Sequence, residues 1–390
     1  MRIFYYCYEK ISPQGSANTH VIEVVENLVK IGHQVVLFLP KFERRFNYSR
    51  KGLIQYVYLP VVKLPLLIWI LYDLFSLIYF TIFSLFNPPQ IIYFRETQSL
   101  IPLLFAKMIH RKVFIEVNGW VIEELKMVGY PRWKLRFLEI CQRFNFRHAD
   151  GIITVSPGLT RLCQQTYRLE PEKLATVPNG TNPERFRALD QMECRQHLGL
   201  PPDCKYIGFV GSCYPYHGLE NLIHAAPLVL TNEPETVFII AGEGPAKADW
   251  QKLVQKLNLT DAFLFPGMVP TAEAPTWINA FTICVAPWRK AYIDEIGVSP
   301  LKLFDYMACS RPIVVSRIKG VTEIVERNQC GFAIDTEKPD VFAKYLLMLL
   351  RDRNLRESQG KNGRTGILLN HTWQITTEKI LQFIDLIQNA

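Results

Sequence analysis

A lysine and an aspartate three residues apart, near the start of an apolar helix, are the side chains in this chain best suited to binding a charged substrate. They belong to residues 299–314 (SPLKLFDYMACSRPIV), whose pattern predicts a polar loop, a helix and a short β-branched strand. Lys302 is a compact cation that suits a phosphate group. Asp305, one turn further along, could accept hydrogen bonds from the two hydroxyl groups of a ribose. The spacing indicates a nucleotide-diphosphate site, although a surface lysine and a solvated helix carboxylate would give the same pattern.

The start of this helix strengthens that interpretation. Pro300 suits a first helical turn, because its missing N–H would be unpaired there in any case. The backbone from Ser299 to Leu301 exposes N–H groups, and such a helix start attracts phosphate. We therefore expect Ser299, Pro300, Leu301 and Lys302 to line the diphosphate.

The composition fits a folded protein of two domains. The chain has 390 residues, of which 49% are hydrophobic and 21% are charged. Its 44 basic and 36 acidic residues give a net charge of +8, which favours an anionic substrate or a membrane surface. No basic block interleaved with aromatic residues resembles a nucleic-acid module, so we expect no nucleic-acid partner. The nine cysteines form no C-x-x-C pair, which favours reduced thiols and a cytoplasmic location.

The first half of the chain alternates strands and helices. Residues 2–8 resemble a buried strand rather than a signal peptide. Apolar residues recur at helical spacing from about Ala17 to Ile31, and Gln34–Leu39 follows as a second strand. This order is the unit of a doubly wound parallel sheet. Further strands are expected at 90–94, 113–117, 151–155 and 174–177.

The pattern restarts after residues 182–205, which carry three prolines and many charges and which we interpret as a linker region. Strands are expected at 206–210, 237–241, 262–265, 283–286 and 313–315, with a helix beginning at Leu219. The fold class is therefore α/β, with two Rossmann-like domains facing a cleft. Ligands of such sheets bind beyond the carboxyl ends of the strands.

Nearly the whole chain resembles the family-4 retaining glycosyltransferases, which have the two-domain GT-B fold. The resemblance rests on the order and spacing of SPQGSANTH, IGHQVVLF, ADGIITVSPGL, VPNGTNPERF, FVGSCYPYHGLENLI, AGEGP, FPGMVP and SPLKLFDYMACSRPIV. It implies an acceptor-side domain at 1–181, a nucleotide-sugar-binding domain at 182–371, and a C-terminal helix at 372–390 that returns to the first domain. It also implies sugar transfer from a nucleotide-sugar without a cofactor and usually without a catalytic metal. The chain has no Asp-x-Asp pair that could hold a diphosphate through a divalent ion.

The segment FVGSCYPYHG matches a family turn that normally carries an arginine and a lysine to neutralise the leaving diphosphate. Gly211 fits that turn, but Ser212 and His217 stand in place of the two cations. The resemblance implies donor binding by Gly211 and Ser212 and a catalytic role for His217. Histidine is mostly neutral near pH 7, so we expect Lys302, also assigned as catalytic, and Arg289 to supply the positive charge.

An acidic pair in the family contacts the donor through the motif E-x7-E. Asp305 stands at its second position, and the first position falls on Gly297. Glu295 or Asp294, on the preceding loop, could contact the sugar instead, or could be simple loop charges. The resemblance thus adds Glu295 to the donor-binding residues.

Two further positions are implied near the ends of strands in the first half. Gly15, in the loop after the first strand, would let the backbone approach a phosphate or the acceptor. Asn118 stands where many family members have a histidine that touches the donor sugar, and its amide can donate and accept hydrogen bonds. We assign Asn118 a catalytic role, with no paired carboxylates of the glycosidase kind beside it.

Turns in the second half match the region where the family holds the nucleobase. These are Glu243 and Gly244 in AGEGP, with FPGM at 265–268. Plain strand-end turns would give the same pattern. Glu323 matches a recurrent family glutamate, and an acidic residue at a helix start is an equally good interpretation.

Residues 64–86 form an apolar stretch of about 23 residues with one charge, long enough to cross a bilayer. Asp73 in its middle is costly in lipid, and a spanning helix would break the sheet. We therefore expect an in-plane helix or hairpin, partly buried and partly dipped into a membrane surface; the alternative is an unusually apolar core helix. The basic residues that would support such contact are Lys41, Arg44, Arg45, Arg50 and Lys51, and Arg132, Lys134, Arg136, Arg143 and Arg147 beside Trp133, Phe137 and Phe144.

These observations predict a cytoplasmic retaining glycosyltransferase, peripheral on the inner face of the plasma membrane if the membrane contact is real. It would move a sugar from a UDP- or GDP-linked donor to a glycan or lipid-linked acceptor, in cell-surface polysaccharide or glycolipid synthesis. Two alternatives remain open. One is a nucleotide-sugar epimerase on the same fold. The other is a catalytically weak nucleotide-sugar-binding subunit of a partner transferase, suggested by Ser212, His217 and Gly297.

Overall fold

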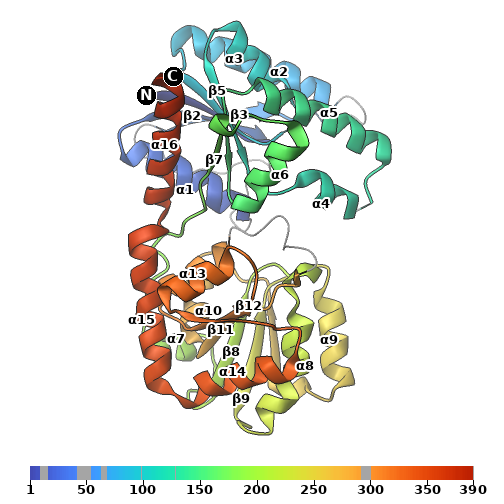
Figure 1. The fold of residues 1–390 in the computed structure, drawn as a ribbon, viewed down its shortest axis with the longest axis vertical. Coiled ribbons are helices and arrows are strands. Elements are labelled where there is room, and N and C mark those ends of the chain that lie inside the picture. Colours follow the sequence, from blue (N-terminus) through green and yellow to red (C-terminus); the bar gives the residue numbers. More distant parts are fainter. Residues whose placement is uncertain are drawn as a thin grey trace. The chain divides into compact units, whose positions relative to one another are not determined.

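The computed structural model describes residues 1–8, 16–41, 54–62, 68–97, 99–127, 129–290 and 300–389. The chain divides into two compact units, and Figure 1 shows the sheet and helices of each. Unit 1 comprises Met1–Pro178 with Trp373–Ala390, and unit 2 comprises Asn179–Thr372. The boundaries expected from the sequence were 181/182 and 371/372.

Unit 1 is built on a seven-stranded parallel sheet with the order β3-β2-β1-β4-β5-β6-β7. Its five inner strands are almost wholly buried, as expected for a parallel sheet covered on both faces. The seven strands are β1 (Arg2–Tyr6), β2 (Gln34–Lys41), β3 (Ile54–Pro60), β4 (Ile91–Arg95), β5 (Lys112–Val117), β6 (Gly151–Thr154) and β7 (Leu174–Thr176).

Helices cover both faces of this sheet. On one face, α1 (Ser16–Lys30) packs against the C-terminal helix α16 (Trp373–Asn389). The connections from β1 to β3 and those from β3 to β6 cross the sheet in opposite directions. Because such crossovers are right-handed, the helices of the second set lie on the face opposite α1 (Figure 1). They are α2 (Ile68–Phe86), α3 (Ile101–Met108), α4 (Val121–Met127) and α5 (Arg132–His148), followed by α6 (Pro157–Tyr167) before β7.

Unit 2 repeats the plan with a six-stranded parallel sheet, ordered β10-β9-β8-β11-β12-β13. Its strands are β8 (Lys205–Val210), β9 (Thr236–Ala241), β10 (Phe263–Gly267), β11 (Ile283–Ala286), β12 (Ile313–Ser316) and β13 (Gly331–Ile334). Its helices include α7 (Gln191–His197), α8 (Leu219–Leu230), α9 (Lys247–Lys256), α10 (Ala274–Ala280), α12 (Leu301–Ala308), α13 (Val321–Asn328), α14 (Pro339–Arg351) and α15 (Arg353–Asn370). Both sheets with their helices establish the two Rossmann-like domains expected from the sequence.

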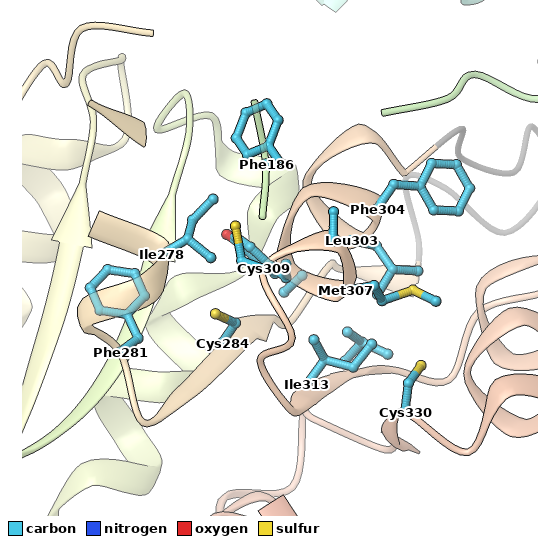
Figure 2. Packing of buried hydrophobic residues seen from close by; sticks show 14 of the residues in the cluster. Phe186, Ile278, Phe281, Cys284, Leu303, Phe304, Met307, Cys309, Ile313 and Cys330 are labelled. Atoms are coloured by element: carbon cyan, nitrogen blue, oxygen red, sulfur yellow. The ribbon is translucent and has the colours of Figure 1, made fainter. Parts of the chain in front are cut away.

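Alternating strand residues of unit 2 fill two separate cores, one on each face of its sheet. One core holds α12, whose Leu303, Phe304 and Met307 pack among the side chains drawn in Figure 2. Truncating such a buried leucine or methionine to alanine typically costs about 2–5 kcal/mol. The buried face of α12 thus fixes the helix against the sheet, and its other face carries Lys302 and Asp305.

The interpretation of residues 182–205 as a linker region is wrong. They contain α7, and Asp190 caps this helix by accepting hydrogen bonds from the N–H groups of Met192 and Glu193, at 2.8 and 2.9 Å. The side chains of Phe186 and Cys194 lie in the same core as α12. The segment is therefore an integral part of unit 2, because its buried side chains, Arg195 of α7 among them, pack into that unit.

The apolar stretch at 64–86 contains one continuous helix, α2, and not a hairpin; residues 64–67 lie outside the described residues. Tyr72, Ser76 and Phe80, four apart, are buried against the sheet. Asp73 accepts a hydrogen bond of 2.6 Å from the Ser99 hydroxyl, and burial raises the pKa of its carboxyl. Among the described helices we find none with the length and apolar character needed to span a bilayer.

Candidate functional site

The loop after β8 brings the backbone of Gly211 against the side chain of Lys302. Gly211 has a φ of +153° and donates a backbone hydrogen bond of 2.9 Å to the carbonyl of Ala241. A Cβ atom at this position would lie 2.0 Å from Cε of Lys302. Only glycine lets the lysine lie across the end of β8 in this way. The sequence-predicted pair of Gly211 and Lys302 is thus brought together by the fold.

Lys302 is partly exposed, yet enough protein surrounds its ammonium group to perturb it. Burial lowers the pKa of Lys302 to about 8, and the charges of Asp305 and Cys213 offset only part of that effect. The ammonium lies 5.6 Å from the centre of the Phe209 ring. A cation with this pKa is still mostly protonated at neutral pH, and an arriving anion would stabilise its charge further.

His217 ends a short 3-10 helix, Pro215–His217, and is 2% exposed. Its Nε2 lies 3.2 Å from Nζ of Lys302. Burial and the neighbouring lysine hold the pKa of His217 well below its usual range. The imidazole is therefore neutral at pH 7 and accepts a hydrogen bond from the ammonium. Its Nδ1 is buried without a hydrogen-bond partner in the described part of the chain.

Asp305 is half-buried one turn after Lys302 on α12. One carboxylate oxygen accepts a hydrogen bond of 2.6 Å from the hydroxyl of Thr181. Pro300 is the residue before the helix rather than its first residue, and no side chain caps this helix start in the described structure. The N-terminal backbone N–H groups of α12, from Leu301 onward, therefore remain suited to an anion.

A second loop, after β9, packs against the first through backbone contacts. The N–H of Cys213 donates to the carbonyl of Glu243 at 2.8 Å. Gly244 has a φ of +155°, and a Cβ there would lie 2.5 Å from the carbonyl oxygen of Cys213. The exposed Glu243 side chain pairs with Lys247 at 2.5 Å, whereas Ser212 is exposed. This close packing explains why position 244 requires glycine. It also brings the loop that carries Ser212 next to the loop that carries Glu243.

Arg289 is held by an ion pair with Glu220, so its charge is already partly neutralised. Glu220 also accepts a hydrogen bond of 3.0 Å from the indole of Trp250. The backbone N–H of Arg289 donates to the carbonyl of Tyr216, at 3.0 Å, in the loop that carries His217. Arg289 thus lies beside the predicted loop, and its guanidinium is paired with Glu220.

In unit 1, Asn118 belongs to a buried network centred on Glu116. The Asn118 amide donates to this carboxylate, as does the Tyr93 hydroxyl at 2.7 Å. Nε2 of His20, from α1, lies 2.5 Å from the carboxylate, and the Tyr5 hydroxyl lies 3.4 Å from it.

Ionisation of Glu116 depends on these partners. Burial alone would raise the pKa of Glu116, but His20, Arg95 and Asn118 together lower it to about 2. Sequence reasoning missed Glu116 and His20. A glutamate inside the otherwise apolar strand VFIEV was the signal that could have found the first of them.

Several predicted positions are not part of this geometry. Gly15, Glu295 and Ser299 lie outside the described residues, as do Asp294 and Gly297. Glu323 accepts a hydrogen bond from the backbone N–H of Gly320 at the start of α13. This contact agrees with the interpretation of Glu323 as an acidic residue at a helix start. Within the described ranges, no group of three or more His, Cys, Asp or Glu side chains could hold a metal ion.

Comparison with known proteins places these units in a family. The model of glycosyl transferases group 1 matches residues 190–366, and the model of Glycosyltransferase Family 4 matches residues 17–185. A D-inositol 3-phosphate glycosyltransferase of Acidothermus cellulolyticus is 27% identical over 242 residues, which are 60% of this chain and 52% of that protein. The chain thus matches about half the length of this relative.

Solved structures share the fold over its full extent. Sucrose-phosphate synthase from Thermosynechococcus elongatus superposes with a TM-score of 0.77 at 17% identity, covering 100% of both chains. Anabaena HepE in complex with UDP-glucose gives a TM-score of 0.69 at 15% identity, covering 98% of this chain and 99% of that one. Together, the two family matches and the paired Rossmann-like sheets show that this chain belongs to the family-4 glycosyltransferases of the GT-B fold.

Proposed function

We propose that this glycosyltransferase takes its sugar from a UDP- or GDP-linked donor, whose diphosphate binds at the start of α12. The observation that carries the proposal is the convergence of Gly211, His217 and Lys302 at the carboxyl end of β8. In parallel sheets this edge is where ligands bind. The UDP-glucose complex of HepE supports a nucleotide-sugar as the donor class.

Lys302 supplies the main positive charge for the leaving diphosphate in this proposal. The C–O bond between the sugar and the β-phosphate breaks, and the diphosphate leaves with the bonding electrons. An ammonium held beside it stabilises the developing negative charge. His217, being neutral, accepts a hydrogen bond from Lys302 and thereby orients it.

Asp305 binds the ribose hydroxyls, and the two loops that carry Ser212 and Glu243–Gly244 lie against the nucleotide. Asn118, held by Glu116, donates a hydrogen bond to a sugar hydroxyl. The acceptor hydroxyl attacks the same face of the sugar that the diphosphate leaves, and its proton passes to the departing phosphate. The product then retains the anomeric configuration, and no metal takes part.

The acceptor is a glycan or a lipid-linked molecule of a cell-surface polysaccharide or glycolipid, and the reaction takes place at the cytoplasmic side of the membrane. Isothermal titration of the protein with UDP, GDP and a panel of their sugar conjugates tests the identity of the donor. Donor hydrolysis and transfer to candidate acceptors are then followed in the presence and absence of EDTA, and the product anomer is read by NMR. Failure of every nucleotide to bind would refute the proposal.

One observation favours a second candidate function. Ser212 and the neutral His217 leave fewer cations around the diphosphate than the family turn normally provides. A nucleotide-sugar-binding subunit with little turnover of its own would fit this arrangement. That function would be identified by tight UDP-sugar binding without transfer or hydrolysis by the protein alone, together with sugar transfer once a partner transferase is added.

A further inference from the structure

The outer faces of α2, α3 and α5 carry large apolar side chains that are exposed to solvent. These helices cover the same face of the unit 1 sheet, so their outer sides face away from it together. Exposed apolar side chains gathered on one side of a domain indicate an interaction site. The residues are Leu74, Ile78, Ile82, Leu85 and Phe86 on α2, Leu104 and Met108 on α3, and Trp133, Phe137, Ile140 and Phe144 on α5.

The four exposed apolar residues of α5 form one stripe, which we call the α5 stripe. Trp133, Phe137, Ile140 and Phe144 follow each other at spacings of four, three and four, so they share one side of the helix. They are 66%, 59%, 60% and 36% exposed. The opposite side is buried in unit 1, through Leu135, Cys141, Gln142, Asn145 and Phe146. The helix is thus anchored on one side and apolar on the side that faces water.

Basic side chains flank the α5 stripe. At 100° per residue, Arg136, Arg143 and Arg147 lie along one border and Lys134 lies along the other, with Arg132 at the helix start. All five are exposed. Glu139 is the one acidic residue of α5, and it lies 4.0 Å from Arg143. The exposed side of α5 therefore has a net charge of several positive units around an apolar centre.

We propose that α5 docks unit 1 onto an anionic membrane, lying in the plane of the interface. The α5 stripe enters the boundary between headgroups and acyl chains, and the flanking arginines and lysines contact anionic headgroups. Trp133 suits this position, because tryptophan concentrates at membrane interfaces. The α2 helix has no basic residue and adds only apolar contact.

Charge also distinguishes this occupant from a second copy of the chain. A symmetric dimer through α5 would place the basic borders of the two copies against each other. Like charges that meet across an interface are destabilising. A surface of anionic headgroups instead matches both the apolar centre and its basic borders. The proposal is independent of the donor site in unit 2 and goes beyond sugar transfer.

Cosedimentation of the full chain with vesicles tests the proposal. Vesicles of phosphatidylcholine with phosphatidylglycerol are compared with pure phosphatidylcholine, at low and high salt. The charge variant is Arg136→Gln/Arg143→Gln, and the stripe variant is Trp133→Ser/Phe137→Ser. The matched control is Leu368→Ser/Leu369→Ser on α15, an exposed apolar pair in unit 2. Thermal unfolding and UDP affinity are measured for each protein without vesicles.

We expect the wild type and the control to bind anionic vesicles equally, with binding lost at high salt. Removing two basic residues should weaken partitioning roughly 30-fold, and the stripe variant should weaken it about tenfold, with UDP affinity unchanged in both. Absence of wild-type binding, equal binding to pure phosphatidylcholine, or unaltered binding of both variants would overturn the proposal. The proposal would also be overturned if the wild type formed a dimer that both variants abolish and did not bind vesicles. Loss of UDP binding in all proteins would refute only the donor-site proposal.

Discussion

The Nζ atom of Lys302 lies 3.2 Å from Nε2 of His217, at the carboxyl end of β8. An ammonium can only donate, and the pKa of His217 is held well below its usual range, so the histidine is the acceptor. The pair therefore carries a single positive charge at neutral pH. This charge belongs to Lys302. Substitution of Lys302 should therefore lower the affinity for a diphosphate more than substitution of His217.

Replacing Lys302 by alanine should weaken UDP binding by about 10- to 100-fold, since a hydrogen bond to a charged group contributes roughly 1.5–3 kcal/mol. Isothermal titration at pH 7 measures the change. Lys252→Ala is the matched control, because Lys252 is exposed in the same unit and pairs only weakly with Asp249, at 3.7 Å. Equal affinities of the wild type and Lys302→Ala would remove the lysine from the site.

The affinity for UDP should also fall as the pH rises through about 8. The pKa of Lys302 lies below its ordinary value of 10.5, so the free protein loses this charge between pH 7 and 9. A diphosphate that requires the ammonium should bind about tenfold more weakly at pH 9 than at pH 7. Lys302→Ala should show a nearly flat profile over this range. A wild-type affinity that does not change up to pH 9 would contradict the assignment.

Gly211→Ala should displace Lys302 and lower UDP affinity by about tenfold or more. The new Cβ would lie 2.0 Å from Cε of Lys302, and φ at this position is +153°. Crowding of this kind costs about 1–3 kcal/mol of stability. Gly199→Ala is the control, because Gly199 also has a positive φ, +67°, but has open space around its Cβ position. A Gly211→Ala variant with wild-type affinity would show that the lysine can move without loss.

Asp305→Ala should weaken UDP binding about tenfold but leave the affinity for inorganic pyrophosphate unchanged, because the carboxylate is assigned to the ribose. The charge of Asp305 raises the pKa of Lys302, so titrations at pH 6.5 keep the lysine protonated in the variant. Thr181→Val removes the hydroxyl that donates to Asp305 and retains the carboxylate. It should change UDP affinity much less. Equal losses for UDP and pyrophosphate would place Asp305 at the phosphates instead.

The parts of the fold that could be predicted from the sequence are those with strong local patterns. The strand Gln34–Lys41 and the helix Ser16–Lys30 each show a clear run of buried apolar residues. The strands β3 and β13 were missed, and both lie at the edges of their sheets. An edge strand pairs on one side only and has less of its surface buried, so its apolar pattern is weaker.

The candidate site was only half visible in the sequence. Lys302 and Asp305 could be found because they lie three apart on one helix. Glu116 and His20 come from a strand and a helix far apart in the chain, and no local pattern joins them. The helix α7 was hidden for a related reason: it is short and charged, and its buried Cys194 has meaning only against the unit 2 core.

Glu116→Gln should lower the stability of the protein in a pH-dependent manner. The pKa of Glu116 is about 2 in the folded protein, below its ordinary value of 4.5, so folding favours the ionised form. The stabilisation is fully present above about pH 4.5 and is lost as the pH falls towards 2. Converted by linkage, this difference is about 3 kcal/mol at neutral pH. The variant should therefore be less stable than the wild type at pH 7, and the difference should shrink at pH 3.

Urea unfolding followed by circular dichroism at pH 7, 5 and 3 measures this difference. Glu172→Gln is the control, since Glu172 is exposed in unit 1. Its effect should be small and independent of pH. A Glu116→Gln variant with the same deficit at pH 3 as at pH 7 would show that the glutamine disturbs packing. In that case the buried contacts of Glu116 with His20 and Tyr93 would stabilise unit 1 through shape rather than charge.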